Sequence, residues 1–181
     1  MNCILNKSKI RTELIKLRNS ISEEKKEIAD IKIINKLYLW LDKNKPKVLG
    51  GYIPIKNEPN LFPLYKKLPT LNIVLALPLV KKKHFPFSYI KWNIGEKLIP
   101  DKTGIPAPIY NKENLIKTNV ILVPCVGFDT ENFRIGYGGG YFDRTLSLKP
   151  KPVTIGISYS FLKTQFIVDK HDVPLDLIIT D

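Results

Sequence analysis

Short apolar runs recur along the chain, and most are rich in β-branched residues and bounded by glycine, proline, asparagine or lysine. Runs without polar alternation are typical of strands that are covered on both faces of a sheet, whereas the run at 85–92 alternates apolar and polar residues. The chain therefore predicts strands over the ranges 48–55, 72–80, 85–92, 120–123, 153–158 and 175–180.

Segments between these runs carry apolar residues at helical spacing. They predict helices over 8–19, from a capping box at Ser20–Glu23 to about Asp42, over 61–68 and over 141–148. Strands interspersed with helices in this way favour an α/β sandwich with a mostly parallel central sheet. No internal repeat or linker divides the chain, so we expect a single domain over residues 1–181.

Segment 120–148 joins a strand, a polar turn, a glycine loop and a short helix. Four glycines, at 136, 138, 139 and 140, stand directly before the predicted helix. Glycines permit positive φ and let a ligand approach the backbone, while free N–H groups before a helix favour an anion such as phosphate. The spacing matches neither the dinucleotide motif nor the P-loop. The loop is therefore either a phosphate site or a surface turn without a ligand.

Side chains around the glycines favour the phosphate interpretation. Arg134 can bind two phosphate oxygens at once, and Asp143 carries the oxygen ligands that Mg²⁺ accepts beside a nucleotide. Tyr137 and Tyr141 can stack on flat ligands. The segment therefore predicts binding of a nucleotide.

The same segment resembles the hallmark of the 5-formyltetrahydrofolate cyclo-ligase family, approximately P-x-x-x-F-D-x-x-G-x-R-L-G-x-G-x-G-Y-Y-D. The matching residues are Pro124, Phe128, Asp129, Arg134, Gly136, Gly138, Gly140, Tyr141 and Asp143. Asn132 replaces the usual glycine, and Phe142 replaces the second tyrosine. Asparagine tolerates a left-handed turn almost as well as glycine, so the first departure is physically mild.

The resemblance implies a three-layer Rossmann-like fold and an enzyme that uses ATP and Mg²⁺. Its reaction would convert 5-formyltetrahydrofolate, with or without a polyglutamate tail, to 5,10-methenyltetrahydrofolate, releasing ADP and phosphate. Arg134 and Lys7 would act in catalysis by neutralising charge during phosphoryl transfer. ATP would lie against Lys7, Ser8, Lys9, Ile10 and Arg11, and against Arg134, Ile135, Gly136, Tyr137, Gly138, Gly139, Gly140, Tyr141 and Phe142.

The family also has a K-x-x-x-R pattern near its start, which Lys7 and Arg11 match. With Arg18 they form a basic row on the first predicted helix. From the residues alone such a row indicates a solvated face. The resemblance instead assigns Lys7 and Arg11 to the nucleotide and leaves the role of Arg18 open.

The resemblance further implies ligands for the folate and the metal. Folate would contact Ile53, Glu58 and Tyr141, and magnesium would contact Asp143 and Asp176. The residues alone also allow a solvated turn charge at Glu58 and a strand cap at Asp176. Phe87 and Trp92 belong either to a folate pocket or to the core. The proline-rich range 98–109 predicts an irregular loop near the site, and Lys81–Lys83 a solvated turn.

Composition adds limits on class and location. The chain has 181 residues, 44% hydrophobic and 25% charged, as in an ordinary globular domain. It contains no apolar run of about 20 residues and no apolar centre of a signal peptide near its start, so we expect a cytoplasmic protein without a membrane span. Two cysteines, Cys3 and Cys125, indicate neither a disulfide nor a metal site. We expect a monomer.

The net charge of +12 raises the question of nucleic-acid binding. Only four of the 29 basic residues are arginine, and they lie in the first helix and the hallmark segment, while lysines are scattered. We therefore expect no nucleic-acid partner, although the positive field would help to capture ATP and folate.

Two other classes remain open from the sequence. A basic RNA-binding module would need aromatic residues interleaved with arginine on an exposed sheet. A phosphosugar isomerase or CoA-transferase of similar fold would need a base near the glycines, and the histidines available are His84 and His171.

Overall fold

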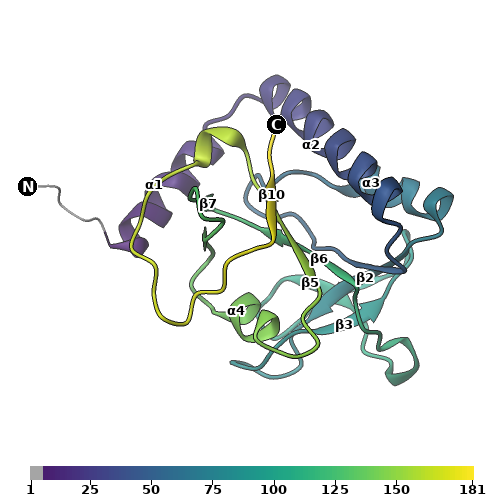
Figure 1. Ribbon diagram of the computed structural model, residues 1–181. Coiled ribbons are helices and arrows are strands. Elements are labelled where there is room, and N and C mark those ends of the chain that lie inside the picture. The colour runs from purple at the N-terminus through teal and green to yellow at the C-terminus, as the bar shows by residue number, and fades with distance from the viewer. Residues whose placement is uncertain (1–5) are drawn as a thin grey trace, which may run out of the picture.

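The computed structural model describes residues 6–181, and its centre is a sheet of six strands (Figure 1). Every neighbouring pair is parallel except β2 and β3, which are antiparallel. This confirms the predicted, mostly parallel sheet. The strands lie in the order β10 (Leu177–Ile179), β9 (Val153–Ile157), β6 (Val120–Pro124), β1 (Val48–Gly50), β2 (Val74–Leu79) and β3 (Ser88–Lys91).

Helices cover both faces of the sheet, which gives the predicted three-layer sandwich. One face packs against α1 (Lys7–Asn19), α2 (Glu23–Asn44) and α3 (Phe62–Lys67), and the other against the short α4 (Tyr141–Leu146) (Figure 1). Short 3₁₀ turns are η1 (Leu68–Leu71), η2 (Lys112–Asn114) and η3 (Ser160–Leu162). None of the helices described within residues 6–181 is both long and apolar enough to span a bilayer.

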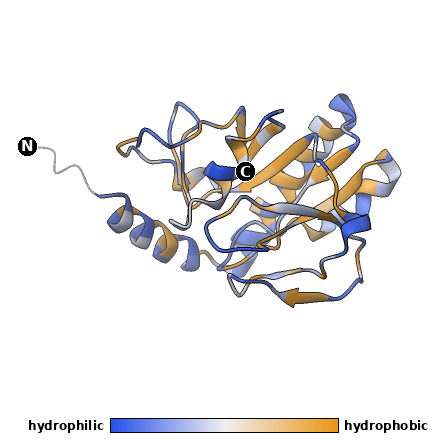
Figure 2. Ribbon diagram, turned by 90° about the horizontal axis from the view of Figure 1, so that it is seen from below, coloured by the Kyte–Doolittle hydropathy of each residue, from blue (hydrophilic) through white to orange (hydrophobic). Residues whose placement is uncertain are grey.

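Strand residues point alternately into two separate cores. Leu49 and Leu122 pack with the helices of the first face, while Val48 and Ile121 pack toward α4. Successive side chains of a strand point to opposite faces, so the continuous apolar runs fill both cores. Figure 2 shows the strands of the sheet largely in the colour of hydrophobic residues. Cys125 is a buried, free thiol whose burial raises its pKa to about 12, and Cys3 lies outside the described residues.

The structure corrects the first predicted strand, which ends at Gly50 instead of continuing to residue 55. A side chain at Gly50 would collide with the Tyr89 ring, and one at Gly51 with the Tyr65 hydroxyl. These glycines therefore make room for tyrosines of the core and not for a ligand. The chain beyond Gly51 is irregular as far as Asn60, since no further ladder holds it.

Two small hairpins were not predicted. The range 98–109 is not wholly irregular, because β4 (Leu98–Pro100) pairs with β5 (Pro106–Pro108). In the hallmark segment, β7 (Gly127–Phe128) pairs with β8 (Arg134–Ile135). Helix α2 begins two residues later than predicted. The capping box Ser20–Glu23 would make Ser20 the N-cap, whereas the N-cap is Ser22, whose hydroxyl accepts a hydrogen bond from Lys25 N.

Strand β1 marks the point where the chain changes direction across the sheet. From β1 the chain continues to β2 and β3 on one side, and it later returns to β6 on the other side of β1. The connections on the two sides of β1 therefore run in opposite directions across the sheet. In open α/β sheets ligands bind outside the carboxyl ends of strands at such a switch point. The carboxyl ends of β1 and β6 are therefore where a site is expected.

Candidate functional site

A cavity of about 670 Å³ opens at the carboxyl ends of β1 and β6. Its walls come from α1, from the segment after β1, from the β4–β5 hairpin tip, from the hallmark segment and from the loop before β10. The residues come from opposite ends of the chain, and the sheet topology brings them together.

The glycine loop forms one wall. Gly138 and Gly140 have φ of 88° and 64°, a region that disfavours other residues. A side chain built at Gly136 would meet no atom within 4 Å. Arg11 Nε donates to the Gly136 carbonyl at 2.6 Å, so the guanidinium of α1 holds the loop. The loop presents open backbone beside a cation, as phosphate binding requires.

Two further cations line the same part of the cavity. Lys7 forms ion pairs with Asp169, at 2.8 Å, and with Asp172. Burial alone would lower the pKa of Lys7, but the hydrogen bonds to both carboxylates outweigh this effect and raise it. Arg134 Nη2 donates to Asp143 at 2.7 Å and Nη1 donates to the Val173 carbonyl at 3.1 Å. Lys7 and Arg134 are thus charged and held in place by the loop before β10.

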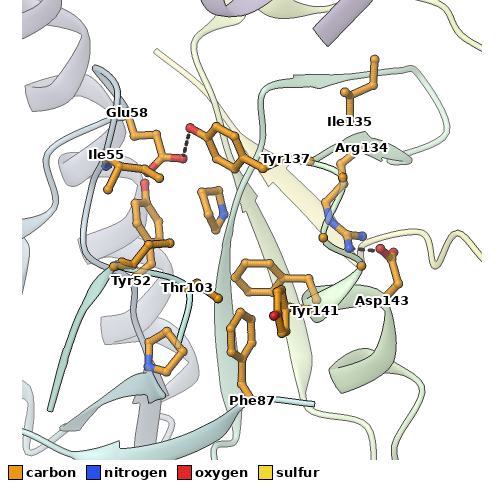
Figure 3. A pocket seen from close by; sticks show the side chains of 18 of the residues that line it. Tyr52, Ile55, Glu58, Phe87, Thr103, Arg134, Ile135, Tyr137, Tyr141 and Asp143 are labelled. Atoms are coloured by element: carbon orange, nitrogen blue, oxygen red, sulfur yellow. Dashed lines mark hydrogen bonds and ion pairs between the residues drawn. The ribbon is translucent and has the colours of Figure 1, made fainter. Parts of the chain in front are cut away.

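Glu58 lies at the other end of the cavity and is not a solvated turn charge, since its exposed fraction is 2%. Its carboxylate accepts from the Tyr137 hydroxyl at 2.8 Å and from Ile55 N at 2.9 Å (Figure 3). Lys56 and Asn57 form the turn between them, both at positive φ. Burial raises the pKa of Glu58, and the hydrogen bonds offset part of this rise. A buried carboxylate facing a cavity can accept hydrogen bonds from a ligand.

Aromatic rings line the floor between these ends. Phe87 stacks on Tyr141 with ring centroids 5.5 Å apart, and Phe142 meets Phe87 edge to face at 4.9 Å (Figure 3). Trp92, by contrast, belongs to the core and does not line the cavity. A flat ligand between Glu58 and the glycines would therefore meet apolar rings.

The structure brings most of the predicted site residues to this cavity. Lys7, Arg11, Ile53, Glu58, Asp143 and the whole range 134–142 line it. Ser8, Lys9 and Ile10 do not. Ser8 and Lys9 are exposed on α1, and Ile10 packs in the core, because only one residue in three or four along a helix faces a given side.

Asp176, predicted as a magnesium ligand, does not line the cavity either. Its Oδ2 accepts from Thr154 N and Thr154 Oγ1, both at 2.7 Å, and its Oδ1 pairs with Lys151. Asp176 therefore joins β9 to the residue before β10, as the alternative interpretation of a strand cap predicted.

Sequence reasoning missed several cavity residues. Asp169 and Asp172 come from a loop without periodicity, and the tip of the β4–β5 hairpin brings in Thr103 and Gly104. Two signals were present: Asp172 stands close to the predicted last strand, and the range 98–109, which contains Thr103 and Gly104, was predicted to lie near the site. Arg18, whose role was open, lies just beneath the cavity and contacts Tyr137.

Carboxylates in the cavity suit a shared magnesium ion better than a self-sufficient metal centre. Within residues 6–181 no three His, Cys, Asp or Glu side chains gather closely enough to hold a metal. Mg²⁺ usually takes one or two carboxylates and completes its shell with water and phosphate oxygens. Asp143 and Asp172 line the cavity near the glycines and fit this arrangement.

Comparisons with known proteins agree with this geometry. A curated 5-formyltetrahydrofolate cyclo-ligase from Mycoplasma pneumoniae is 34% identical over 98% of this chain and 99% of its own length. A solved 5,10-methenyltetrahydrofolate synthetase from the same organism superimposes with a TM-score of 0.77 at 30% identity, covering 98% of this chain and 99% of the other. The 5,10-methenyltetrahydrofolate synthetase of Aquifex aeolicus superimposes with a TM-score of 0.82 at 30% identity, covering 97% of this chain and 89% of the other.

A model of one protein family matches almost the whole chain, over residues 4–181. The match therefore includes α1, the segment that carries Glu58, the glycine loop and the loop before β10. The chain belongs to the 5-formyltetrahydrofolate cyclo-ligase family.

Proposed function

We propose that this chain converts 5-formyltetrahydrofolate to 5,10-methenyltetrahydrofolate with ATP and Mg²⁺, releasing ADP and phosphate. The conversion follows from membership of the family. The nucleotide, the metal and the residue roles are supported by one observation above all: a single cavity joins a glycine loop with three cations to a buried carboxylate. Such a cavity can hold a triphosphate and a polar aromatic substrate end to end.

The chemistry requires both ends of the cavity. A formyl oxygen is a poor leaving group until the γ-phosphoryl group is transferred to it, with cleavage of the bond to the β-phosphate. N10 then attacks the formyl carbon and loses its proton, and the oxygen departs with the phosphate. Phosphoryl transfer depends mainly on positioning and on charge stabilisation. No side-chain nucleophile is needed.

Lys7, Arg11 and Arg134 supply the positive charge at the phosphate end. Magnesium held by Asp143 and Asp172 would screen the phosphate charges. Before the phosphates bind, the ion pairs with Asp172 and Asp143 keep Lys7 and Arg134 in place. Both cations then leave their aspartate partners and bind the phosphates. Aromatic rings between the two ends exclude water from the reacting atoms.

Glu58 binds the donor groups of the reduced pterin ring, and Ile53 and Tyr141 line the same folate pocket. A buried carboxylate that already accepts two hydrogen bonds is fixed in orientation, so it can position the N5-formyl group. Neither His84 nor His171 lines the cavity, which leaves an isomerase-type mechanism without its histidine base.

We further propose that the protein works as a single-domain monomer in the cytoplasm, without nucleic-acid or membrane partners. One chain supplies both ends of the cavity, so catalysis needs no second copy. Sedimentation of the purified protein measures the oligomeric state and so checks that the protein is a monomer.

Incubation with 5-formyltetrahydrofolate, ATP and Mg²⁺ tests the function. We expect the methenyl chromophore to appear with one ADP and one phosphate for each product. Omission of ATP, or chelation of Mg²⁺, should abolish the signal. Product formation without ATP would refute the proposed nucleotide dependence.

A further inference from the structure

Arg18 is the most completely buried charged side chain beside the cavity, with an exposed fraction of 0%. It stands on α1, two helical turns beyond Arg11. Its Nε donates to the Lys56 carbonyl at 2.9 Å, and its Nη2 donates to the Tyr137 hydroxyl. Its Nη1 finds no partner within residues 6–181.

Both contacts of Arg18 lead to Glu58. The Tyr137 hydroxyl donates a 2.8 Å hydrogen bond to Glu58 and accepts one from Arg18, so the arginine and the carboxylate bind the same hydroxyl. Lys56 precedes Glu58 by two residues, in a turn at positive φ. Because Arg18 binds the Lys56 carbonyl, it holds this turn and, with it, the position of the Glu58 carboxylate.

Structural stability alone does not account for this arginine. Burying a charge destabilises the fold, and an unpaired buried donor destabilises it further. A residue that served only to pack α1 would be apolar, like Leu14 on the same helix. The planar guanidinium of Arg18 instead donates to two acceptors on separate segments, the Lys56 carbonyl and the Tyr137 hydroxyl. The single ammonium of a lysine cannot reproduce this geometry.

The charge of Arg18 also acts on Glu58. Burial raises the pKa of the Glu58 carboxyl, while the nearby charges of Arg18 and Lys56 lower it. The other titratable groups that face this carboxyl are the hydroxyls of Tyr137, Tyr52 and Tyr65 and the thiol of Cys125, all with raised pKa values. Arg18 and Lys56 therefore act with the hydrogen bonds from Ile55 N and Tyr137 to oppose the rise that burial causes in the pKa of Glu58.

We propose that Arg18 is a positioning residue for folate: through the Tyr137 hydroxyl and the Lys56 carbonyl it fixes the orientation of Glu58. The inference rests on the proposed function, because it gives Glu58 a folate to bind. Arg11 and Arg18 hold the neighbouring residues Gly136 and Tyr137. Helix α1 therefore fixes the phosphate end and the folate end of the cavity together.

Steady-state kinetics of four single variants, and of the double variant that combines Arg18→Met with Tyr137→Phe, test this role. Arg18→Met removes the charge and both hydrogen bonds, Arg18→Lys restores the charge, and Tyr137→Phe removes only the bridging hydroxyl. Lys16→Met is the matched control, because Lys16 is an exposed cation in the same last turn of α1. Apparent KM and kcat are measured for 5-formyltetrahydrofolate and for ATP across pH, with calorimetry for ATP binding.

We expect Arg18→Met to lower kcat/KM for the folate by about tenfold or more, with ATP affinity within about twofold of wild type. The acidic limb of the folate profile should move to higher pH, since the charge that lowers the pKa of Glu58 is gone. Arg18→Lys should return that limb toward wild type while KM stays raised. Adding Tyr137→Phe to Arg18→Met should cost less than the two single effects combined.

Wild-type folate kinetics and an unmoved acidic limb in Arg18→Met would overturn the proposal, as would an equal loss of ATP and folate binding. If Arg18→Met does not fold, Tyr137→Phe decides: unchanged folate kinetics there would refute the route through the hydroxyl. A wild-type protein that forms no methenyl product refutes the proposed function itself. Turnover by wild type with no difference among the variants refutes only the role of Arg18.

Discussion

Replacing Glu58 by glutamine tests the folate end of the cavity with the least structural change. The side chain is 2% exposed and accepts hydrogen bonds from Tyr137 and from Ile55 N, so glutamine fits the same space. The glutamine carbonyl can keep one of these bonds. Its amide group faces the second donor, and the negative charge is lost.

The magnitude follows from the bond that folate would lose. A hydrogen bond to a charged group contributes about 1.5 to 3 kcal/mol, which corresponds to about ten- to hundredfold in kcat/KM. We expect this loss to appear as a raised apparent KM for 5-formyltetrahydrofolate. ATP binding should stay nearly unchanged, because Glu58 lies across the cavity from Arg134 and Asp143 and contacts the glycine loop only through the Tyr137 hydroxyl (Figure 3).

Methenyl formation at saturating ATP measures the effect, and calorimetry with ATP provides the second readout. Glu113→Gln, on the exposed turn η2, is the matched control for loss of a carboxylate. A fall in kcat alone would show that Glu58 acts on the transition state. Folate kinetics at wild-type values would refute the assignment and move the folate pocket toward Tyr52 and Phe87.

Four further predictions follow from the cavity. Gly138→Val should weaken ATP binding about tenfold or more in calorimetry, because a β-branched residue opposes the φ of 88°; equal affinity would remove the loop from the site. Arg134→Lys should lower kcat about tenfold or more at saturating folate, since one ammonium cannot replace the fork; unchanged turnover would make Arg134 structural. Asp172→Asn should raise the Mg²⁺ concentration needed for half-maximal turnover, whereas Asp176→Asn should lower only the melting temperature; the reverse result would restore Asp176 as the ligand. Serine at all three positions of Lys81–Lys83 should leave turnover intact, and a large loss would contradict the assignment as a solvated turn.

The strands of the central sheet could be predicted because the short apolar run that marks a strand is a local feature of the sequence. A short apolar run predicts a strand whatever its neighbours are, so all six strands of the central sheet were predicted. Five predicted ranges are longer than the observed strands, and the sixth, 120–123, is one residue shorter. Where a strand stops depends on its partners. Beyond Gly50, the backbone N–H and carbonyl of Tyr52 bond the Tyr65 hydroxyl instead of a neighbouring strand, which the local pattern of 48–55 cannot show.

From the residues alone, the site was predictable where its residues form one continuous segment. Lys7, Arg11, Ile53 and Glu58 also line the cavity, but they were assigned to the site only through the family resemblance. The range 134–142 lines the cavity as a unit, since a turn and a glycine loop determine its path. Glu58 seemed a surface charge from its turn context, and only packing against Tyr137 and Arg18 makes it buried. Asp172 and Asp176 are alike in sequence context, and the ladder between β9 and β10 decides which of them faces the cavity.

A structure of the complex with Mg²⁺, a non-hydrolysable ATP analogue and 5-formyltetrahydrofolate would show whether one cavity holds both substrates. We expect the triphosphate against Gly136–Gly140 with Lys7 and Arg134 turned onto its oxygens, and the pterin ring hydrogen-bonded to Glu58 in the same cavity. A triphosphate bound away from the glycines, or a pterin ring out of reach of Glu58, would contradict this expectation.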